Sequence, residues 1–223
     1  MKEKCKQIRR DVLQASFESN ACHIGSALSC VEILVDLFYN KLKENDIFLF
    51  SKASGVATLY CILADKGYFP KEKLVYYLKN YPLASKEVPG IIHSVGSVGH
   101  GLSVGCGIAL GKKLKKEKGN VYVLISDGEL NEGSTYEAVL FVRQHKLNNL
   151  FIICDNNGYQ ACGAIKDILD LETAFEFYKK TLPNFERVKT IKGQGVSFME
   201  GKVQWHYKNL TEESLEQALK ENE

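Results

Sequence analysis

The 223-residue sequence lacks the features that mark several common classes of protein. Its formal net charge is only +2, from 29 basic and 27 acidic side chains, so no strongly charged partner is implied. The lysine cluster at residues 112–118 has no interleaved aromatic residues, which indicates a solvated helix end rather than a nucleic-acid surface. No apolar run approaches the ~20 residues that span a membrane, and no apolar segment follows the charged N-terminus.

Disulfide and zinc frameworks are not indicated either. The sequence holds seven cysteines, an odd number, and no two of them form a Cys-x-x-Cys pair. Several lie inside apolar runs, where a thiol acts as a small hydrophobe. We therefore expect a reduced, soluble, cytoplasmic protein. No internal repeat, low-complexity tract or linker divides the chain, which predicts a single α/β domain over residues 1–223.

A strand–helix–strand unit is predicted in the middle of the chain. Residues 121–126 and 150–154 are short runs rich in β-branched residues. Between them, residues 134–146 carry apolar side chains at helical spacing, and a crossover of this length fits parallel strands. Asp127 and Asn157 stand just past the two runs. Because the carboxyl ends of parallel strands meet at one edge of a sheet, where open α/β sheets bind ligands, both side chains can reach one ligand.

The donor types at this edge predict a metal–diphosphate site. A carboxylate oxygen, an amide oxygen and nearby backbone carbonyls suit a hard cation such as Mg²⁺ or Ca²⁺ rather than zinc. Mg²⁺ held by few protein ligands keeps positions for phosphate oxygens. The alternative is that Asp127-Gly128 and Asn157-Gly158 are merely turn formers. Two such turns, one crossover apart, favour the metal site.

A glycine-rich stretch precedes another predicted helix. Residues 96–103 read Gly-Ser-Val-Gly-His-Gly-Leu-Ser, and the helix that they open is rich in small residues. Glycines before a helix let backbone N–H groups approach a phosphate, which the helix dipole favours. The stretch is therefore either a diphosphate cradle or a place of close helix packing.

Other elements are predicted from apolar periodicity and from capping and turn residues. Ser29 with Glu32 forms a capping box that predicts the start of a buried second helix. The remaining predicted helices cover residues 4–19, 56–66, 70–79 and 169–179, with a last one from Thr211; predicted strands cover residues 47–50 and 187–191, and residues 80–98 form a loop.

The central stretch resembles the thiamine-diphosphate-binding motif, which begins Gly-Asp-Gly and ends further along the chain in Asn-Asn. Here it begins Ser126-Asp127-Gly128 and ends Asn156-Asn157. The resemblance extends along nearly the whole chain. Over this length the sequence resembles the N-terminal half of the transketolase family. The other matching segments are His23–Ser26, Ser51-Lys52 with Ala57–Tyr60, Val88–Ser103, Asp127–Gly133, Asn157–Gln160, Lys189–Glu200 and Trp205-His206.

The resemblance implies a three-layer thiamine-diphosphate-binding α/β fold, with a mainly parallel central sheet flanked by helices. It also implies a role for each matched residue. Asp127 and Asn157 would hold Mg²⁺ (or Ca²⁺) through side-chain oxygens, and Tyr159 through its backbone carbonyl. The implied cofactor-binding residues are Ser54, Gly96, Ser97, Val98, Gly128, Glu129, Asn157 and His206. The implied catalytic residues are His23 at the substrate oxygens, His206 near the diphosphate and the reacting centre, and Glu132 at the subunit interface beside the pyrimidine.

The resemblance implies a partner as well. In this family a glutamate on a pyrimidine-binding domain helps to remove a proton from the thiazolium carbon, and that domain normally follows in the same chain. Here the sequence ends at Glu223 without it. We therefore expect a separately encoded subunit that carries this domain and its glutamate, in an α₂β₂ heterotetramer.

Departures from the family pattern concern the substrate. Ser54 stands where transketolases have a histidine, and the loop histidine expected before Val88 has no match. His93 and His100 replace Ala and Gln, and Tyr207 replaces a glycine. We expect transfer of a two-carbon ketol or acyl unit to an aldehyde or ketone acceptor. The expected substrate is a specialised sugar, modified or nucleotide-linked, rather than an ordinary pentose phosphate.

Two alternatives stay open. The α subunit of a 2-oxo-acid decarboxylating dehydrogenase shares the metal motif, although the Lys-Gly-x-Gly-Val-Ser-Phe-Met-Glu stretch resembles transketolase. A non-catalytic scaffold subunit would account for the missing histidines, but it would have no need of an intact metal site.

Overall fold

The computed structural model describes the whole chain, residues 1–223. The chain divides into two compact units whose segments alternate along the sequence. The helical unit comprises Met1–Lys41, Ser54–Ser94 and Thr190–Glu223. The sheet unit comprises Leu42–Ala53 and Val95–Lys189. The single domain predicted for residues 1–223 stays a prediction.

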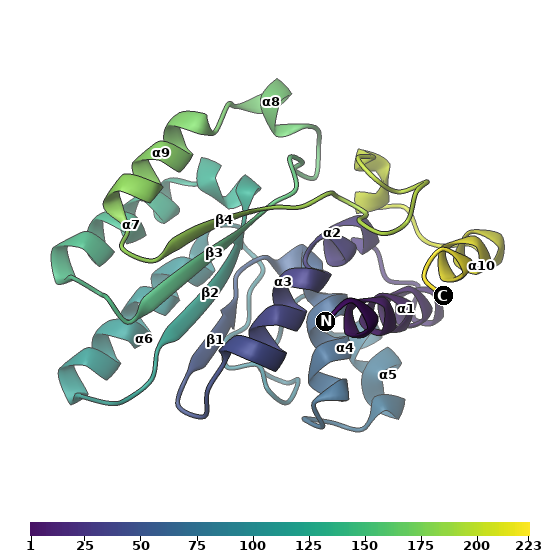
Figure 1. Ribbon diagram of the computed structural model, residues 1–223, viewed down its shortest axis with the longest axis horizontal. Helices are drawn as coiled ribbons and strands as arrows, with labels where there is room; N and C mark the ends of the chain where they lie inside the picture. The colour runs from purple at the N-terminus through teal and green to yellow at the C-terminus, as the bar shows by residue number, and fades with distance from the viewer. The chain divides into compact units, whose positions relative to one another are not determined.

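The sheet unit contains four parallel strands in the order β1-β2-β3-β4 (Figure 1). They are β1 (Ile47–Phe50), β2 (Val121–Ser126), β3 (Leu150–Asn156) and β4 (Phe185–Lys189). The predicted α/β class and parallel sheet are confirmed. The strand predicted at 187–191 begins earlier, at Phe185.

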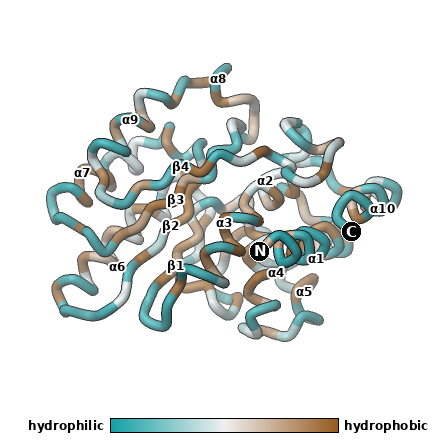
Figure 2. Tube along the Cα trace, viewed as in Figure 1, coloured by the Kyte–Doolittle hydropathy of each residue, from teal (hydrophilic) through white to brown (hydrophobic).

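The crossover helices of the sheet unit lie along one side of its strands in Figure 1. They are α6 (His100–Lys115), α7 (Gly133–His145) and α9 (Glu172–Thr181), with a short α8 (Ile165–Ile168) before α9. Parallel strands taken in sequence order and joined by right-handed crossovers place every connecting helix on the same face, which accounts for this layer. Figure 2 shows hydrophobic residues along β2 and β3, and their buried side chains pack with those of the helices in one core.

The helical unit is built around α1 (Lys2–Ser19), which contacts the other helices of this unit. These are α2 (Ile24–Ser29), α3 (Val31–Asp36), α4 (Val56–Asp65), α5 (Leu74–Asn80) and α10 (Glu212–Lys220). The predicted helices at 4–19, 56–66 and 70–79 are confirmed, although a 3₁₀ turn (Lys71–Lys73) follows Pro70 before α5 begins. The last helix, predicted to start at Thr211, begins at Glu212, and Thr211 is its N-cap, whose hydroxyl accepts from the Ser214 N–H.

The predicted capping box at Ser29 is wrong. Ser29 is the last residue of α2, and its hydroxyl donates to the Ser26 carbonyl (2.9 Å) inside the helix. The next helix, α3, starts after Cys30 without a side-chain cap. A serine hydroxyl can satisfy itself on the preceding turn, so the sequence pattern did not require a helix start. The actual start is at Ile24, after His23 takes a left-handed φ of 69°.

The sequence predicted no membrane-spanning segment and no disulfide framework. No helix in the structure is both long and apolar enough to cross a bilayer. All seven cysteines are free thiols, five of them buried. Two of them, Cys106 and Cys154, belong to the hydrophobic core of the sheet unit, where a thiol acts as a small hydrophobe.

Candidate metal and diphosphate site

The ends of β2 and β3 bring together two predicted metal ligands. The strands pair in parallel with Ser126 opposite Asp155, so Asp127 and Asn157 are the first residues beyond them. The N–H of Gly158 donates to Oδ2 of Asp127 (2.7 Å). The two turns are therefore tied directly to each other, as the strand–helix–strand pattern predicts.

The turn after β3 holds oxygen atoms of the kind that a hard cation binds, on the buried Asn157 side chain and on the backbone. Gly158 has a φ of 80°, a left-handed conformation that favours glycine. In this turn Oδ1 of Asn157 accepts from the N–H of Tyr159 (3.0 Å). No cluster of three His, Cys, Asp or Glu side chains that could hold a metal is found. One carboxylate with amide and backbone oxygens fits Mg²⁺ or Ca²⁺ and does not fit zinc.

The Asp127 carboxylate is poorly stabilised as an anion by the protein alone. Its side chain is 0% exposed, and this burial raises the pKa of Asp127 to about 7. The Gly158 N–H acts against the rise, the Asp155 carboxylate adds to it, and Lys52 opposes it. A bound cation would stabilise the charged form, so the residues present fit a metal at this corner.

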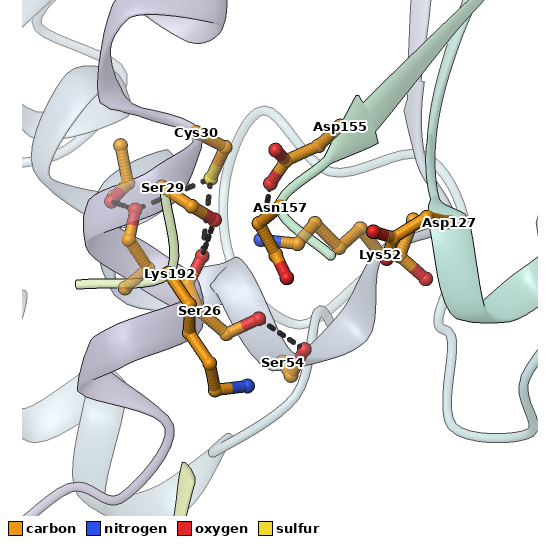
Figure 3. A network of polar contacts seen from close by, with 12 residues as sticks. Ser26, Ser29, Cys30, Lys52, Ser54, Asp127, Asp155, Asn157 and Lys192 are labelled. Atoms are coloured by element: carbon orange, nitrogen blue, oxygen red, sulfur yellow. Dashed lines mark hydrogen bonds and ion pairs between the residues drawn. The ribbon is translucent and has the colours of Figure 1, made fainter. Parts of the chain in front are cut away.

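A buried ion pair beside Asp127 escaped the sequence predictions. Lys52 Nζ lies 2.7 Å from Asp155 Oδ2, and the two side chains are 1% and 0% exposed. Figure 3 shows the Lys52 side chain lying between Asp127 and Asp155. Charged residues are rarely buried unless they are paired. Asp155 is the one charged residue in the apolar strand β3, and that placement was the available signal.

The Glu129 carboxylate joins three parts of the sheet unit. It accepts from the hydroxyl of Ser51, just past β1, and from the N–H (2.6 Å) and hydroxyl (3.0 Å) of Ser126. The backbone N–H of Gly99, before α6, is a further donor to it. The pKa of Glu129 is raised by burial, and the hydrogen bonds from these donors offset only part of the rise. Its oxygens thus bind protein groups, while its predicted contact with the cofactor stays a prediction.

The predicted phosphate-side loop is exposed just before α6. Gly96, Ser97 and Val98 are exposed, with Val98 at 50%. Gly99 follows with a φ of 83° and its carbonyl accepts from the Ser134 hydroxyl (3.1 Å) at the start of α7. Three exposed residues before a 16-residue helix leave backbone N–H groups available to an anion.

Two further residues of the segment Asp127–Gly133, Gly128 and Glu132, have predicted roles. Gly128 is half-buried and lies against the side chain of Gln160, 3.3 Å from where a Cβ would stand. Glu132 is half-buried and precedes α7 without capping it through its side chain. The carbon atoms of Glu132 crowd Gly99, so a side chain at that glycine would collide with them. The roles predicted for Gly128 and Glu132 stay predictions.

The helical unit holds a second group of predicted site residues, the histidine cluster, formed by His23, His206 and Tyr207. The rings of His23 and His206 meet edge to face with centroids 4.8 Å apart. Tyr207 lies 4.8 Å from the His206 ring and 6.0 Å from the His23 ring, and it is 65% exposed. The His23 N–H also donates to the His206 carbonyl (2.8 Å). The fold thus brings His23 and His206, which are far apart in the sequence, into contact. The catalytic roles predicted for the two histidines stay predictions.

Ser54 belongs to the helical unit and faces another serine there. Its Oγ lies 2.8 Å from Oγ of Ser26, a hydrogen bond drawn in Figure 3. A hydroxyl pair of this kind offers donors and acceptors but no base that works at neutral pH. The cofactor-binding role predicted for Ser54 stays a prediction.

Comparison with known proteins gives one family and several relatives. Residues 1–220 match the family described as 1-deoxy-D-xylulose-5-phosphate synthase. The chain is 35% identical to one subunit of the apulose-4-phosphate transketolase of Actinobacillus succinogenes, over 99% of this chain and 95% of the relative. That alignment runs over 263 positions, more than the 223 residues here, so the relative carries segments that this chain lacks.

Other relatives differ in how much of their length is matched. The chain is 30% identical to a 6-deoxy-6-sulfo-D-fructose transketolase subunit from a Clostridium species, over 97% of this chain and 94% of that subunit. It is 31% identical to a transketolase from Pongo abelii, over 99% of this chain but 42% of the relative. A solved transketolase structure from Campylobacter jejuni matches with a TM-score of 0.86 at 23% identity, over 99% of this chain and 42% of that one. At this identity the structural likeness establishes the fold.

Proposed function

This chain belongs to the transketolase family, and we propose that it is the diphosphate-binding subunit of a two-subunit transketolase that depends on Mg²⁺ and thiamine diphosphate. It would transfer a two-carbon ketol or acyl unit to an aldehyde or ketone acceptor. The observation that carries this proposal is the corner formed by Asp127 and Asn157. A buried carboxylate there, with a pKa raised to about 7, stands in hydrogen-bond contact with the amide-bearing turn.

The cofactor would be held at the carboxyl edge of the sheet. Asp127 and Asn157 would bind Mg²⁺ through side-chain oxygens and Tyr159 through its carbonyl, and Ca²⁺ could replace the metal. Gly128 and the exposed loop, Gly96 to Val98, would offer backbone N–H groups to the diphosphate. Thiamine diphosphate supplies a thiazolium carbon that, once deprotonated, is a nucleophile toward carbonyl groups.

The remaining site residues would act on substrate and subunit contacts. His23 and His206, whose rings touch, would hydrogen-bond to substrate oxygens, with His206 also near the diphosphate. Glu132 would stand at the subunit interface beside the pyrimidine. Ser54 would contact the cofactor as a hydroxyl, in the place where transketolases carry a histidine.

A separately encoded partner would complete the enzyme. Two relatives that match this chain over nearly their whole length are named as transketolase subunits. By contrast, the matched transketolase from Pongo abelii is covered over 42% of its length. We expect the partner to supply the pyrimidine-binding domain and its glutamate, in an α₂β₂ assembly. Seven free thiols fit a reducing compartment, which supports a cytoplasmic location.

The expected substrate is a specialised sugar. The named subunit relatives act on apulose-4-phosphate and on 6-deoxy-6-sulfo-D-fructose. In this chain Ser54 and the exposed Tyr207 stand where transketolases have histidine and glycine, which changes both the polarity and the width of the site. A modified sugar, rather than an ordinary pentose phosphate, fits these changes.

The test is two-carbon transfer by this chain assembled with its partner. With Mg²⁺, thiamine diphosphate and a panel of ketose donors, we expect transfer to an aldehyde acceptor. Asp127→Ala should abolish it, whereas Asp167→Ala, at an exposed position of α8, should not. Release of carbon dioxide from pyruvate without sugar transfer would favour a 2-oxo-acid decarboxylating subunit. Transfer that survives Asp127→Ala would remove the metal site from the mechanism.

A further inference from the structure

A buried lysine contacts one ring of the histidine cluster. Lys192 is 1% exposed, and its Nζ lies 3.1 Å from Nδ1 of His206, which is itself 8% exposed. An ammonium group has three N–H donors and no acceptor, so Nδ1 must accept in this contact. We propose that Lys192 is a positioning residue that fixes His206 as the neutral tautomer with its proton on Nε2.

The loop that carries Lys192 is anchored on both sides of it. The N–H of Gly193 donates to the carbonyl of Gly25 (2.8 Å), and the N–H of Gly201 donates to the carbonyl of Lys192 (2.9 Å). Gly193 has a φ of 79°, which lets the backbone turn at this point. Nε of Arg9 donates to the carbonyl of Gln194 (3.0 Å). The backbone at Lys192 is therefore fixed, and the burial of its side chain confines the ammonium group to the contact with His206.

The backbone and the ring of His206 are also fixed by contacts within the helical unit. Its backbone carbonyl accepts from the His23 N–H, and its ring packs edge to face against the rings of His23 and Tyr207. The preceding residue, Trp205, is 3% exposed and lies within 3.2 Å of the Cβ position of Gly25. The backbone segments that carry Lys192 and His206 thus both contact the N-terminal end of α2. This common anchor holds the two side chains next to each other.

The chemical consequence is that His206 acts as a hydrogen-bond donor. With Nδ1 accepting from Lys192, the ring proton is on Nε2, so Nε2 can donate to a carbonyl or phosphate oxygen. A second proton could go only to Nδ1, where it would displace the Lys192 hydrogen bond and place an imidazolium beside an ammonium, which like-charge repulsion disfavours. This catalytic consequence rests on the proposed transketolase function, whereas the tautomer itself does not.

The tautomer is measurable in this chain alone. Nitrogen-15 spectra of labelled imidazole rings separate Nδ1–H from Nε2–H forms, and with five histidines in the chain His206→Gln identifies the signal at pH 8. We expect the Nε2–H form in the wild type and in Lys202→Met, a matched exposed lysine of the same loop. Lys192→Met should lose this preference, and Lys192→Arg, which keeps a charged donor, should retain it.

Two results would overturn the proposal. The first is an Nδ1–H tautomer in the wild type, which decides the matter even if Lys192→Met fails to fold. The second is a folded Lys192→Met variant whose His206 signal matches the wild type. In the assembled enzyme, Lys192→Met should lower kcat by about 100-fold with little change in KM, while Lys202→Met leaves both unchanged. A wild-type complex without thiamine-diphosphate-dependent turnover would refute the proposed function and leave the tautomer result standing.

Discussion

Replacing Lys52 with methionine is expected to lower the free energy of unfolding by about 3–5 kcal/mol. Methionine keeps an unbranched apolar side chain but removes the ammonium 2.7 Å from the Asp155 carboxylate. That carboxylate is 0% exposed, so water cannot replace the lost partner. The neighbouring Asp127 carboxylate is a second buried acid, and Lys52 is the cation that acts on both.

The effect is large enough to read in a melting curve. For a chain of this size, about 3–5 kcal/mol corresponds to a fall in Tm of about 6–20 °C. Far-UV circular dichroism during heating and in urea measures it. The matched control is Lys220→Met, which breaks the exposed Lys220–Glu216 pair, also 2.7 Å long, with side chains 66% and 70% exposed. An exposed pair of this kind is screened by water, so its loss should leave the urea midpoint and the Tm nearly unchanged.

A double variant tests the electrostatic cause separately from packing. Lys52→Met with Asp155→Leu removes both charges and should recover most of the lost stability, because an apolar replacement of a buried pair is often neutral. The reasoning is refuted if Lys52→Met unfolds at the same urea concentration as Lys220→Met, or if the double variant is less stable than the single one.

Three further predictions concern stability and substrate. Asp65 is partly buried, which acts to raise its pKa, but hydrogen bonds from Tyr39, Lys4 and Gln7 prevail and lower it to about 2. Its contribution, about 1–2 kcal/mol after solvent screening, should be present above pH 4 and lost as the pH falls toward 2, so Asp65→Asn should flatten acid denaturation curves over that range. Glu129→Ala should destabilise the chain by about 2–4 kcal/mol in urea unfolding by leaving the Ser51, Ser126 and Gly99 donors without this acceptor, and Glu129→Gln should cost less. Tyr207→Gly should raise kcat/KM of the assembled enzyme for ordinary pentose phosphates by at least about tenfold, and no gain would show that Tyr207 does not restrict the substrate.

The sequence was most informative where local pattern and chemistry coincide. The apolar runs of β2 and β3 end in Asp-Gly and in Asn-Asn-Gly, and both the strand ends and the meeting of Asp127 with the Asn157 turn follow from that pattern. Helix α1 was likewise predictable from the spacing of its apolar residues.

Other features depend on contacts between distant segments and left little local trace. The left-handed φ of His23 is unusual for a residue other than glycine, so the start of α2 at Ile24 carries no sequence signal. Ser29 imitates a cap while its hydroxyl binds within the helix. The contact of Lys192 with His206 joins residues 14 positions apart, the second of them in a 3₁₀ turn (Val203–His206), and only the folded backbone brings them together.

Binding of thiamine diphosphate tests the central claim most directly. We would titrate the cofactor, with Mg²⁺, into this chain, into its partner, and into the mixture, and follow the heat by calorimetry. The account predicts tight binding only in the mixture, one cofactor for each pair of subunits, and its loss in Asp127→Ala. Tight binding by the partner alone, or binding by the mixture that is unchanged in Asp127→Ala, would contradict it.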